Sequence, residues 1–453
     1  MTVIYILFIV IFGFSVLLLM VLKLKLNAFI SLLITSILIG ILTGMPLSDI
    51  STSINVGMGG TLGFIATVVG LGAIFGQMLD HSGGAKALAQ YLIRRFGQGK
   101  TSWALMITGL VVGIPIFFDV AFIIIVPMVY ALTRNTKRSI LYFAIPLLAG
   151  LLATHVMVPP TPGSMAVAEI LDVELGWVIL FGLLVAVPSA TIAGPLFGQY
   201  ISKKIYIPAP SEPLEIETEP EKSSHKQPSF RIVLVIIAAP LLLILMHTFL
   251  NMGMKSGYLK TNLFFEVLSF IGHPFTALII ATLLAILLCL KMKMSPQSIL
   301  DLSTKALEPA GIIILVTGAG GVLKQILIDS GIGKILAESI AESSMPLIIL
   351  AWLLAALVRI TQGSATVAMI TAAGIMAPIM SVFSLMQPEM ALIVVAIASG
   401  ATVLSHVNDS GFWIVSKYLR MNEKKTLQSW TVMSTIIAFC GLGCTLLISS
   451  IIC

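Results

Sequence analysis

The sequence predicts an all-α, polytopic membrane protein made of two inverted-topology repeats, with about ten full spans, two re-entrant hairpins and broken helices. Three observations predict this class. Of the 453 residues, 58% are hydrophobic and only 10% are charged, whereas soluble domains carry about 25% charged residues. Apolar runs of spanning length recur along the chain, and motifs of its first half return in its second half. The composition therefore excludes a disordered chain, a secreted disulfide scaffold and an ordinary cytosolic enzyme.

The net charge of +6 does not indicate a nucleic-acid partner, because the basic residues of a membrane protein mainly set its orientation in the bilayer. The apolar run 2–22 is followed by two lysines, which predicts a first transmembrane helix rather than a cleaved signal peptide. We expect no metal site and no cofactor, because the cysteines show no metal-binding spacing. They are Cys289, Cys440, Cys444 and Cys453.

Most apolar segments have the length of one crossing, about 20 residues. They lie at 2–22, 27–44, 60–80, 140–157, 175–201, 230–252, 264–290, 309–328, 390–405 and 428–452. Two longer stretches, 102–132 and 346–380, contain internal helix breakers. Each suits either one tilted, broken helix or a hairpin that enters and leaves the membrane on the same side.

The distribution of lysine and arginine favours the hairpins. With the N-terminus outside and both stretches folded as hairpins, the outside loops hold only Lys255, Lys260 and Lys334. A single crossing by 102–132 would instead carry the basic cluster at 134–138 to the outside. That arrangement would weaken the excess of basic residues expected on the cytoplasmic side.

A polar insert at 205–229 divides the chain into two halves of similar length. It reads as a cytoplasmic linker between a first repeat, 1–204, and a second repeat, 230–453. The glycine-rich segment 69–77 matches 317–325, and further on Thr-His-Val at 154–156 matches Ser-His-Val at 405–407. In the topology above the two glycine-rich segments run in opposite directions. Inverted repeats with broken helices are typical of transporters.

Four breaks, two in each half, carry the polar residues at membrane depth. The first, 113–119, ends on Asp119, an intramembrane acid that predicts a functional site. A helix-capping role for the same carboxylate stays open. The second, 359–366, offers small and hydroxylated side chains beside a cation, which suit an anionic or polyhydroxylated ligand. Its candidate residues are Arg359, Gln362, Gly363, Ser364 and Thr366.

Arg359 has three possible roles: pairing with a substrate carboxylate, neutralising a buried acid, or reaching to the membrane interface. The third break, 155–164, contains prolines that forbid a regular helix. It supplies Thr161, Gly163 and Ser164 as further candidate ligands. The fourth break, 405–411, is the most polar, and its Asn408 and Ser410 are candidates for substrate binding.

Proton coupling is expected at Asp119, Asp409, His155 or His406. Buried acids are the better proton carriers in transporters, which favours the two aspartates. Each histidine has the alternative role of a neutral residue that joins two helices by hydrogen bonds. Trp103, Trp177 and Trp430 are expected to anchor span ends at the membrane interface.

The chain resembles the gluconate:proton symporter family, also called the gluconate permease family, over essentially its whole length. The resemblance rests on Gly-Met-Gly-Gly-Thr-Leu-Gly at 57–63, Gly-Ile-Pro-Ile-Phe-Phe-Asp-Val at 113–120, His-Val-Met-Val-Pro-Pro-Thr-Pro-Gly at 155–163, Gln-Gly-Ser-Ala-Thr-Val-Ala at 362–368 and Ser-His-Val-Asn-Asp-Ser-Gly-Phe-Trp at 405–413. It implies a bacterial inner-membrane carrier that imports sugar acids with protons, or D-serine in one branch. It also implies a homodimer with a scaffold domain and a mobile domain that moves in an elevator-like cycle.

This chain departs from the family pattern at two positions. Many gluconate carriers have His where this chain has Thr161, and Pro where it has Ser164. The D-serine branch also tends to have that His, so the departure selects no known substrate. It puts gluconate itself in doubt and removes one titratable group.

We therefore expect a secondary active transporter for a small hydroxylated carboxylate, driven by proton symport. Sodium coupling, D-serine or another small organic acid are the alternatives within this class. A membrane-embedded enzyme would concentrate a nucleophile and base, or metal ligands, on one side of the membrane. Here the polar breaks are duplicated in both halves, which favours alternating access over catalysis or a passive channel.

Overall fold

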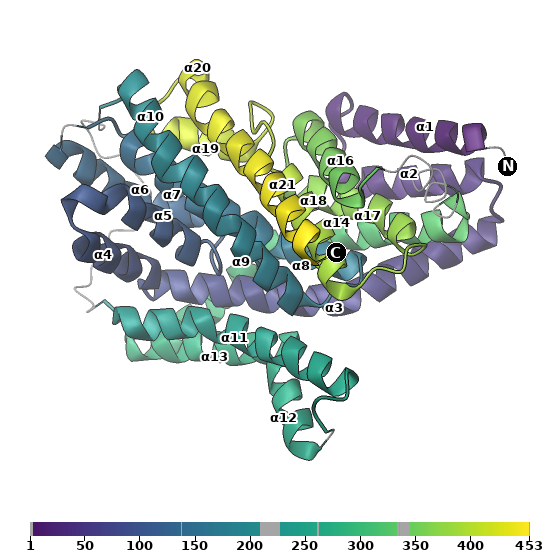
Figure 1. Ribbon diagram of the computed structural model, residues 1–453, viewed down its shortest axis with the longest axis horizontal. Helices are drawn as coiled ribbons and strands as arrows, with labels where there is room; N and C mark the ends of the chain where they lie inside the picture. The colour runs from purple at the N-terminus through teal and green to yellow at the C-terminus, as the bar shows by residue number, and fades with distance from the viewer. Residues whose placement is uncertain are drawn as a thin grey trace.

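The computed structural model describes residues 3–136, 138–208, 227–260, 262–332, 335 and 345–452, and these are helical with no strand among them. Figure 1 shows an elongated bundle with one pair of helices along one side, here called the arm, and a short third helix that projects from this pair. Most of the predicted linker, 209–226, lies outside the described residues, as do Lys334 and Cys453.

The helices of the first half follow the predicted order. They are α1 (Val3–Leu22), α2 (Ala28–Leu42), α3 (Leu47–His81), α4 (Gly84–Phe96), η1 (Gln98–Lys100), α5 (Thr101–Val112), α6 (Phe118–Thr136), α7 (Leu141–Met157), α8 (Pro162–Ile170), α9 (Leu175–Thr191), η2 (Ile192–Leu196) and α10 (Phe197–Lys204). The segment η2 is a π-helical bulge that joins α9 to α10 without ending the span.

The described part of the second half is also made of helices. They are α11 (Phe230–Lys255), α12 (Leu263–Gly272), α13 (Pro274–Lys291), α14 (Pro296–Asp329), α16 (Leu347–Gln362), α17 (Ala365–Met380), α18 (Gln387–Gly400), α19 (Ser410–Tyr418), α20 (Glu423–Thr426), η3 (Leu427–Thr431) and α21 (Val432–Ile452). The long helix, the helical hairpin and the broken helix of the first half thus have counterparts in α14, α16–α17 and α18–α19.

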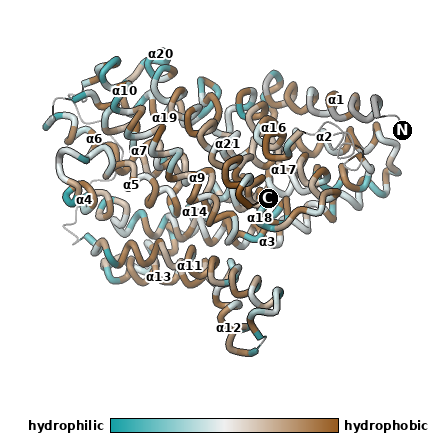
Figure 2. Tube along the Cα trace, viewed as in Figure 1, coloured by the Kyte–Doolittle hydropathy of each residue, from teal (hydrophilic) through white to brown (hydrophobic). Residues whose placement is uncertain are grey.

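Eight helical segments of the described chain are long and apolar enough to cross a membrane. They are Leu47–His81, Phe118–Thr136, Leu141–Ile170, Leu175–Lys204, Phe230–Lys255, Pro274–Lys291, Pro296–Asp329 and Glu423–Ile452. Shorter apolar helices accompany them, among them α2, α5, α16, α17 and α18. In Figure 2, apolar residues cover the middle of the bundle, and hydrophilic residues concentrate near helix ends such as those of α4, α10 and α20. The predicted all-α polytopic membrane class is confirmed.

The expected single span at 264–290 is wrong, because the chain breaks at His273. Proline at 274 begins α13, with the His273 side chain accepting a hydrogen bond from the Phe275 amide at 3.4 Å. A proline has no amide hydrogen to continue the preceding helix, and it disfavours helical geometry in the residue before it. The break leaves α12 as the short helix that projects from the arm in Figure 1.

The two long apolar stretches form helical hairpins, α5–α6 and α16–α17. Figure 1 shows these hairpins apart from each other along the bundle, with α7, α8 and α18 between them. The first hairpin is longer than expected, since α6 continues to Thr136 and is by itself long enough to cross a membrane. Side chains along α7 and α18 are almost all buried, so these two helices form the centre of the fold.

The two longest helices, α3 and α14, cross in direct backbone contact. A Cβ atom placed on Gly57 would lie 2.6 Å from the carbonyl oxygen of Gly321, and one placed on Gly321 would lie 2.5 Å from that of Gly57. Small residues allow this kind of close approach between membrane helices. Gly57 and Gly321 therefore allow the two helices to pack tightly.

We expect Gly57→Ala to destabilise the protein by about 1–3 kcal/mol, because the added methyl group would overpack the crossing. Gly59, on the same helix, has open space around its Cβ position. Gly59→Ala is therefore the matched control, and it should be neutral or slightly stabilising because alanine is the better helix former. Thermal unfolding of the detergent-solubilised variants measures both effects. Equal unfolding temperatures for the two variants would show that the crossing tolerates a side chain.

Candidate functional site

The turn of the first hairpin holds Asp119 toward the centre of the bundle. This turn, between Val112 and Phe118, is wedged against α3, because a Cβ on Gly76 would lie within 2.1 Å of the Pro115 carbonyl oxygen. On its other side, a Cβ on Gly113 would lie 2.5 Å from the Thr154 hydroxyl of α7. Asp119 lies in the first turn of α6 and is half-buried.

The turn of the second hairpin depends on a glycine. Gly363 ends α16 with a positive φ of 89°, a conformation that glycine adopts without strain. A Cβ at this position would also meet the Asn408 carbonyl oxygen at 2.1 Å. The Ser364 side chain then caps α17 by accepting a hydrogen bond from the Val367 amide. The hairpin turn is thereby pressed against the break between α18 and α19.

The break between α18 and α19 is held by side-chain hydrogen bonds to this turn. The Asn408 side-chain amide donates to the carbonyl oxygens of Ile360 and Thr361, at 3.0 and 3.3 Å. The His406 Nε2 nitrogen donates to the same Ile360 carbonyl at 3.0 Å. These bonds satisfy carbonyl groups that the end of α16 leaves without helical partners.

Arg359 and Asp409 form the central ion pair of the site. Arg359 Nη2 lies 2.5 Å from Asp409 Oδ2, and the arginine side chain is only 3% exposed. Asp409 also caps α19 by accepting a hydrogen bond from the Gly411 amide at 3.1 Å. Of the roles that the sequence leaves open for Arg359, this contact agrees with the pairing with an acid, because the guanidinium lies against the partly buried Asp409 carboxylate.

A chain of hydrogen bonds extends from this ion pair to α21. Ser405 donates its hydroxyl to Asp409 Oδ2, and Trp430 Nε1 donates to the Ser405 hydroxyl at 2.6 Å. The π-helical bulge η3 places Trp430 at this point, and Thr431 from the same bulge donates to the Ser405 carbonyl. These hydrogen bonds fix the position of the Asp409 carboxylate, and the carboxylate in turn orients the Arg359 guanidinium.

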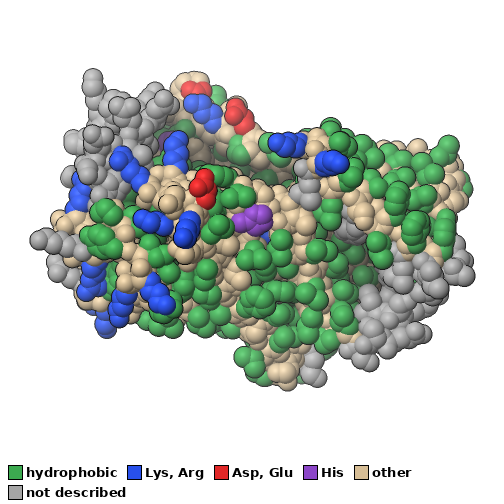
Figure 3. Space-filling view, turned by 90° about the horizontal axis from the view of Figure 1, so that it is seen from above, with side chains coloured by type: hydrophobic (Ala, Val, Ile, Leu, Met, Phe, Trp, Pro, Cys, Tyr) green, Lys and Arg blue, Asp and Glu red, His purple; other side chains and the backbone are tan. Residues whose placement is uncertain are grey.

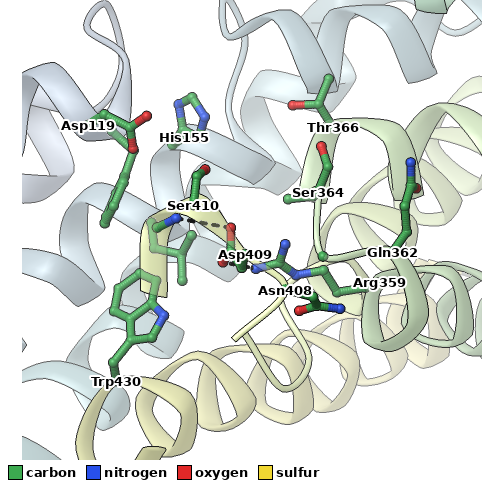
Figure 4. A pocket seen from close by; sticks show the side chains of 15 residues that line it. Asp119, His155, Arg359, Gln362, Ser364, Thr366, Asn408, Asp409, Ser410 and Trp430 are labelled. Carbon is green, nitrogen blue, oxygen red and sulfur yellow. Dashed lines mark hydrogen bonds and ion pairs between the residues drawn. The ribbon is translucent and has the colours of Figure 1, made fainter. Parts of the chain in front are cut away.

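A cavity of about 370 Å³ lies between the two hairpins and the fourth break. Figure 4 shows Asp119 and His155 on one side of it, Ser364, Thr366 and Gln362 on the other, and the Arg359–Asp409 pair between them. Its lining is formed by Phe118, Asp119, Leu152, His155, Arg359, Gln362, Gly363, Ser364, Ala365, Thr366, Asn408, Asp409, Ser410, Gly411 and Trp430.

Several buried polar atoms of this lining have no hydrogen-bond partner. They are Nε and Nη1 of Arg359, Oε1 of Gln362 and Nδ1 of His155. Buried polar groups are almost always paired in native proteins, and leaving one unpaired costs about 1–3 kcal/mol. A cluster of unpaired donors and acceptors around one cavity therefore points to a polar ligand that completes them.

Most of the expected site residues meet in this cavity, although they come from both halves of the chain. Those that line it are Asp119, His155, Arg359, Gln362, Gly363, Ser364, Thr366, Asn408, Asp409 and Ser410. His406 is not among the lining residues, and its hydrogen bond to Ile360 fits the alternative role of joining two segments.

The third break was expected to supply substrate ligands, but its three candidate residues lie away from the cavity. The hydroxyls of Thr161 and Ser164 are buried and hydrogen-bond to each other at 2.8 Å. The backbone carbonyl oxygens of Val158 and Thr161 also lie within hydrogen-bond distance of these hydroxyls, so the proton that the pair does not share has an acceptor. Gly163 packs against the sulfur of Met369, and none of these three residues lines the cavity. Thr161 instead borders a separate space of about 10 Å³ beside His155.

The position of Trp430 at the cavity is not predicted by the sequence. Its expected role as an interface anchor is wrong, because the side chain is only 1% exposed and lines the cavity. The available signal was the polar residues on the same turns of the helix, Ser429, Thr431 and Ser434, which mark a face turned away from lipid. No group of three or more metal-ligating side chains occurs among the described residues.

We expect Trp430→Phe to weaken substrate binding about tenfold, because it removes the hydrogen bond that fixes Ser405 and, through it, Asp409 and Arg359. Trp177→Phe is the control, since Trp177 lies outside the cavity and packs on Phe181 and Phe249. Substrate binding to the purified variants, measured by calorimetry, tests this expectation. An unchanged affinity for Trp430→Phe would show that the ion pair needs no support from α21.

Comparison with known proteins decides the family of the chain. Residues 4–452 match the model of a family described as GntP family permease. The chain belongs to the GntP permease family. It is therefore a permease rather than an enzyme and, with its apolar spans, a multi-pass protein of the bacterial inner membrane.

Several curated relatives of this GntP permease align over nearly its full length. The low-affinity gluconate transporter of Escherichia coli K12 is 39% identical over 426 residues, which cover 94% of each chain. The gluconate permease of Pseudomonas aeruginosa is 38% identical over 438 residues, or 96% of each chain. The Gnt-II system L-idonate transporter of Escherichia coli K12 is 35% identical over 445 residues, covering 97% of this chain and 98% of the relative.

Two solved transporter structures share the fold of this GntP permease. The YdaH transporter of Alcanivorax borkumensis superposes with a TM-score of 0.60 at 15% identity, covering 89% of this chain and 90% of its own. MtrF of Neisseria gonorrhoeae superposes with a TM-score of 0.56 at 14% identity, covering 88% and 85% of the two chains. At these identities the likeness extends to the fold alone.

Proposed function

We propose that this permease imports a small hydroxylated carboxylate, gluconate or a closely related sugar acid, together with a proton. The relatives are named for gluconate and L-idonate transport, which supports this substrate class. The observation that carries the proposal is the buried Arg359 guanidinium, which has two nitrogens without partners at the wall of a polar cavity.

The substrate carboxylate binds at Arg359 in this proposal. One of its nitrogens is occupied by Asp409, while Nε and Nη1 carry further N–H donors. Charge-assisted hydrogen bonds from arginine to a carboxylate are among the strongest polar contacts in proteins. Because Asp409 already holds the guanidinium in place, little side-chain entropy is lost when the substrate arrives.

The hydroxyl groups of the substrate bind the hairpin turn and the fourth break. Two helices begin at the cavity: α17, which Ser364 caps, and α19, whose first residue is Ser410. The first turn of a helix exposes amide donors and favours negative charge. The Gln362 side-chain oxygen, which is buried and unpaired, is an acceptor for a substrate hydroxyl, and Thr366 and Asn408 add further polar groups. Since Thr161, Gly163 and Ser164 do not line the cavity, the departure from the family pattern there lies away from these contacts.

The balance of charges in the cavity supports coupling to a cation. Arg359 and Asp409 neutralise each other, which leaves the carboxylate of Asp119 with no ion pair among the described residues. A substrate anion would add a second negative charge beside this half-buried carboxylate, and uncompensated charges are costly where contact with water is reduced. A proton on Asp119 removes one of these charges, so substrate and proton enter together.

Uptake into proteoliposomes tests the coupling ion. We expect an inward pH gradient to drive gluconate accumulation without sodium, and an inward sodium gradient at equal pH to drive none. Sodium is the rival ion because carbonyl and side-chain oxygens at broken helices are suited to bind it. Accumulation that requires sodium and ignores the pH gradient would exclude the proton version. A competition panel of gluconate, L-idonate, hexuronates, glycerate and D-serine then ranks the substrates.

We further propose that the two halves, 1–204 and 230–453, are inverted repeats joined by the linker 205–229, and that transport is an elevator-like movement in a homodimer. The pairing of α5–α6 with α16–α17, and of α7–α8 with α18–α19, supports this division. In this cycle the hairpins and broken helices move as one body against a scaffold that includes α3 and α14. Cross-links that lock α3 to the moving body should stop transport but leave substrate binding intact.

A further inference from the structure

An apolar groove with a basic end lies on the arm formed by α11 and α13. It has a volume of about 390 Å³, and apolar side chains of both helices line it. Val235 on α11 and Leu287 on α13 are 63% and 59% exposed, so the groove opens on the outer surface of the protein. Figure 2 shows the apolar character of both helices along their length.

Two cations stand at one end of this groove. Arg231 lies in the first turn of α11, and Lys291 is the last residue of α13. Both side chains line the groove, both residues are exposed, and neither has an ion pair or a side-chain hydrogen bond with any described residue. Figure 1 shows that the start of α11 and the α13 end are at the same end of the molecule. In Figure 3, many other basic side chains also gather toward that end.

This arrangement matches an amphipathic anionic molecule rather than a water-soluble ligand. The wall of the groove offers little besides apolar side chains, so a polar solute would find few hydrogen-bond partners there. α13 packs against α3 and α11 packs against α13 and α9, and both are long enough to cross the bilayer, so their outer surface faces lipid. Basic residues where apolar helices meet the membrane surface attract anionic lipid headgroups.

We propose that this groove is a binding site for an anionic phospholipid. One acyl chain occupies the apolar groove between α11 and α13, and the phosphate-containing headgroup pairs with Arg231 and Lys291. The positive-inside rule places these two residues on the cytoplasmic side, so the lipid comes from the inner leaflet. The site lies on the outer surface of the arm and shares no residue with the transport cavity.

Native mass spectrometry of the delipidated protein tests the proposal. The purified permease is incubated with equal amounts of phosphatidylglycerol and phosphatidylethanolamine, and the retained lipids are counted. We expect the wild type to retain phosphatidylglycerol over phosphatidylethanolamine by about tenfold, and Arg231→Gln/Lys291→Gln to lose this preference. The matched control is Lys424→Gln/Lys425→Gln, which removes the same charge from α20 and should keep the preference.

A variant that fills the groove distinguishes lipid binding in the groove from mere attraction of the lipid headgroup to the two cations. Leu287→Trp leaves both cations in place but narrows the groove, so we expect it to retain less phosphatidylglycerol. Equal retention by this variant and the wild type, or an unchanged preference in the double glutamine variant, would overturn the proposal. Disulfide-linked dimers formed through Val235→Cys would also overturn it, because a second copy of the chain would then cover the groove.

Discussion

Replacing Arg359 by glutamine is expected to reduce substrate binding by about a hundredfold or more. The change removes the donors proposed for the substrate carboxylate, and it leaves Asp409 buried without its cation. A hydrogen bond to a charged group contributes about 1.5–3 kcal/mol, and each 1.4 kcal/mol corresponds to about tenfold in affinity. Counterflow in proteoliposomes and calorimetry on the purified protein measure the loss.

A double variant shows whether Arg359→Gln weakens binding through lost substrate contacts or through a destabilised fold. Arg359→Gln/Asp409→Asn replaces both charges, so no unpaired ion stays buried and the unfolding temperature should recover toward the wild-type value. Substrate binding should not recover, since the guanidinium is still missing. If the double variant bound gluconate as the wild type does, Arg359 would be a structural partner of Asp409 and the substrate carboxylate would bind elsewhere. Arg359→Lys adds a second test, because lysine keeps the charge but lacks the planar fork of donors.

Asp119→Asn is expected to abolish accumulation driven by a pH gradient while leaving exchange of bound substrate close to the wild-type rate. Asparagine keeps the size of the side chain, but it cannot take up and release a proton. The substrate anion then meets a cavity that is already neutral, so binding persists without coupling. We expect the accumulation ratio to fall at least about tenfold, which corresponds to the loss of roughly 1.4 kcal/mol of driving force. Uptake and counterflow assays on the same vesicles give both readings.

Variants of two other aspartates serve as comparisons for Asp119→Asn. Asp49→Asn is the control, because Asp49 is exposed in the first turn of α3, away from the cavity. It should accumulate substrate normally. Asp409→Asn should lose accumulation and binding together, since the Arg359 guanidinium loses the acceptor that orients it. Normal accumulation by Asp119→Asn at normal expression would remove Asp119 from the coupling step, and a selective loss of accumulation in Asp409→Asn would assign that step to Asp409.

Much of the polar site was predictable because a charged or strongly polar residue is costly inside a membrane. Asp119, Arg359 and Asp409 stand out in an apolar sequence for that reason alone, and each of them lines the cavity. Thr161 and Ser164 show the limit of this reasoning. Small hydroxyl groups can satisfy each other and the local backbone, as these two do, so their presence at a break says little about what they contact.

Composition and charge by themselves determined the class of protein, the two hairpins and most of the polar residues that line the cavity. Long apolar runs permit few alternatives, because every backbone polar group inside a bilayer has to be satisfied within a helix. Only the tertiary structure decided which polar atoms are paired and which are free. The pairing of Arg359 with Asp409 and the position of Trp430 behind them depend on contacts between segments far apart in the chain. Such contacts follow from how the helices pack, and no local pattern in the sequence encodes them.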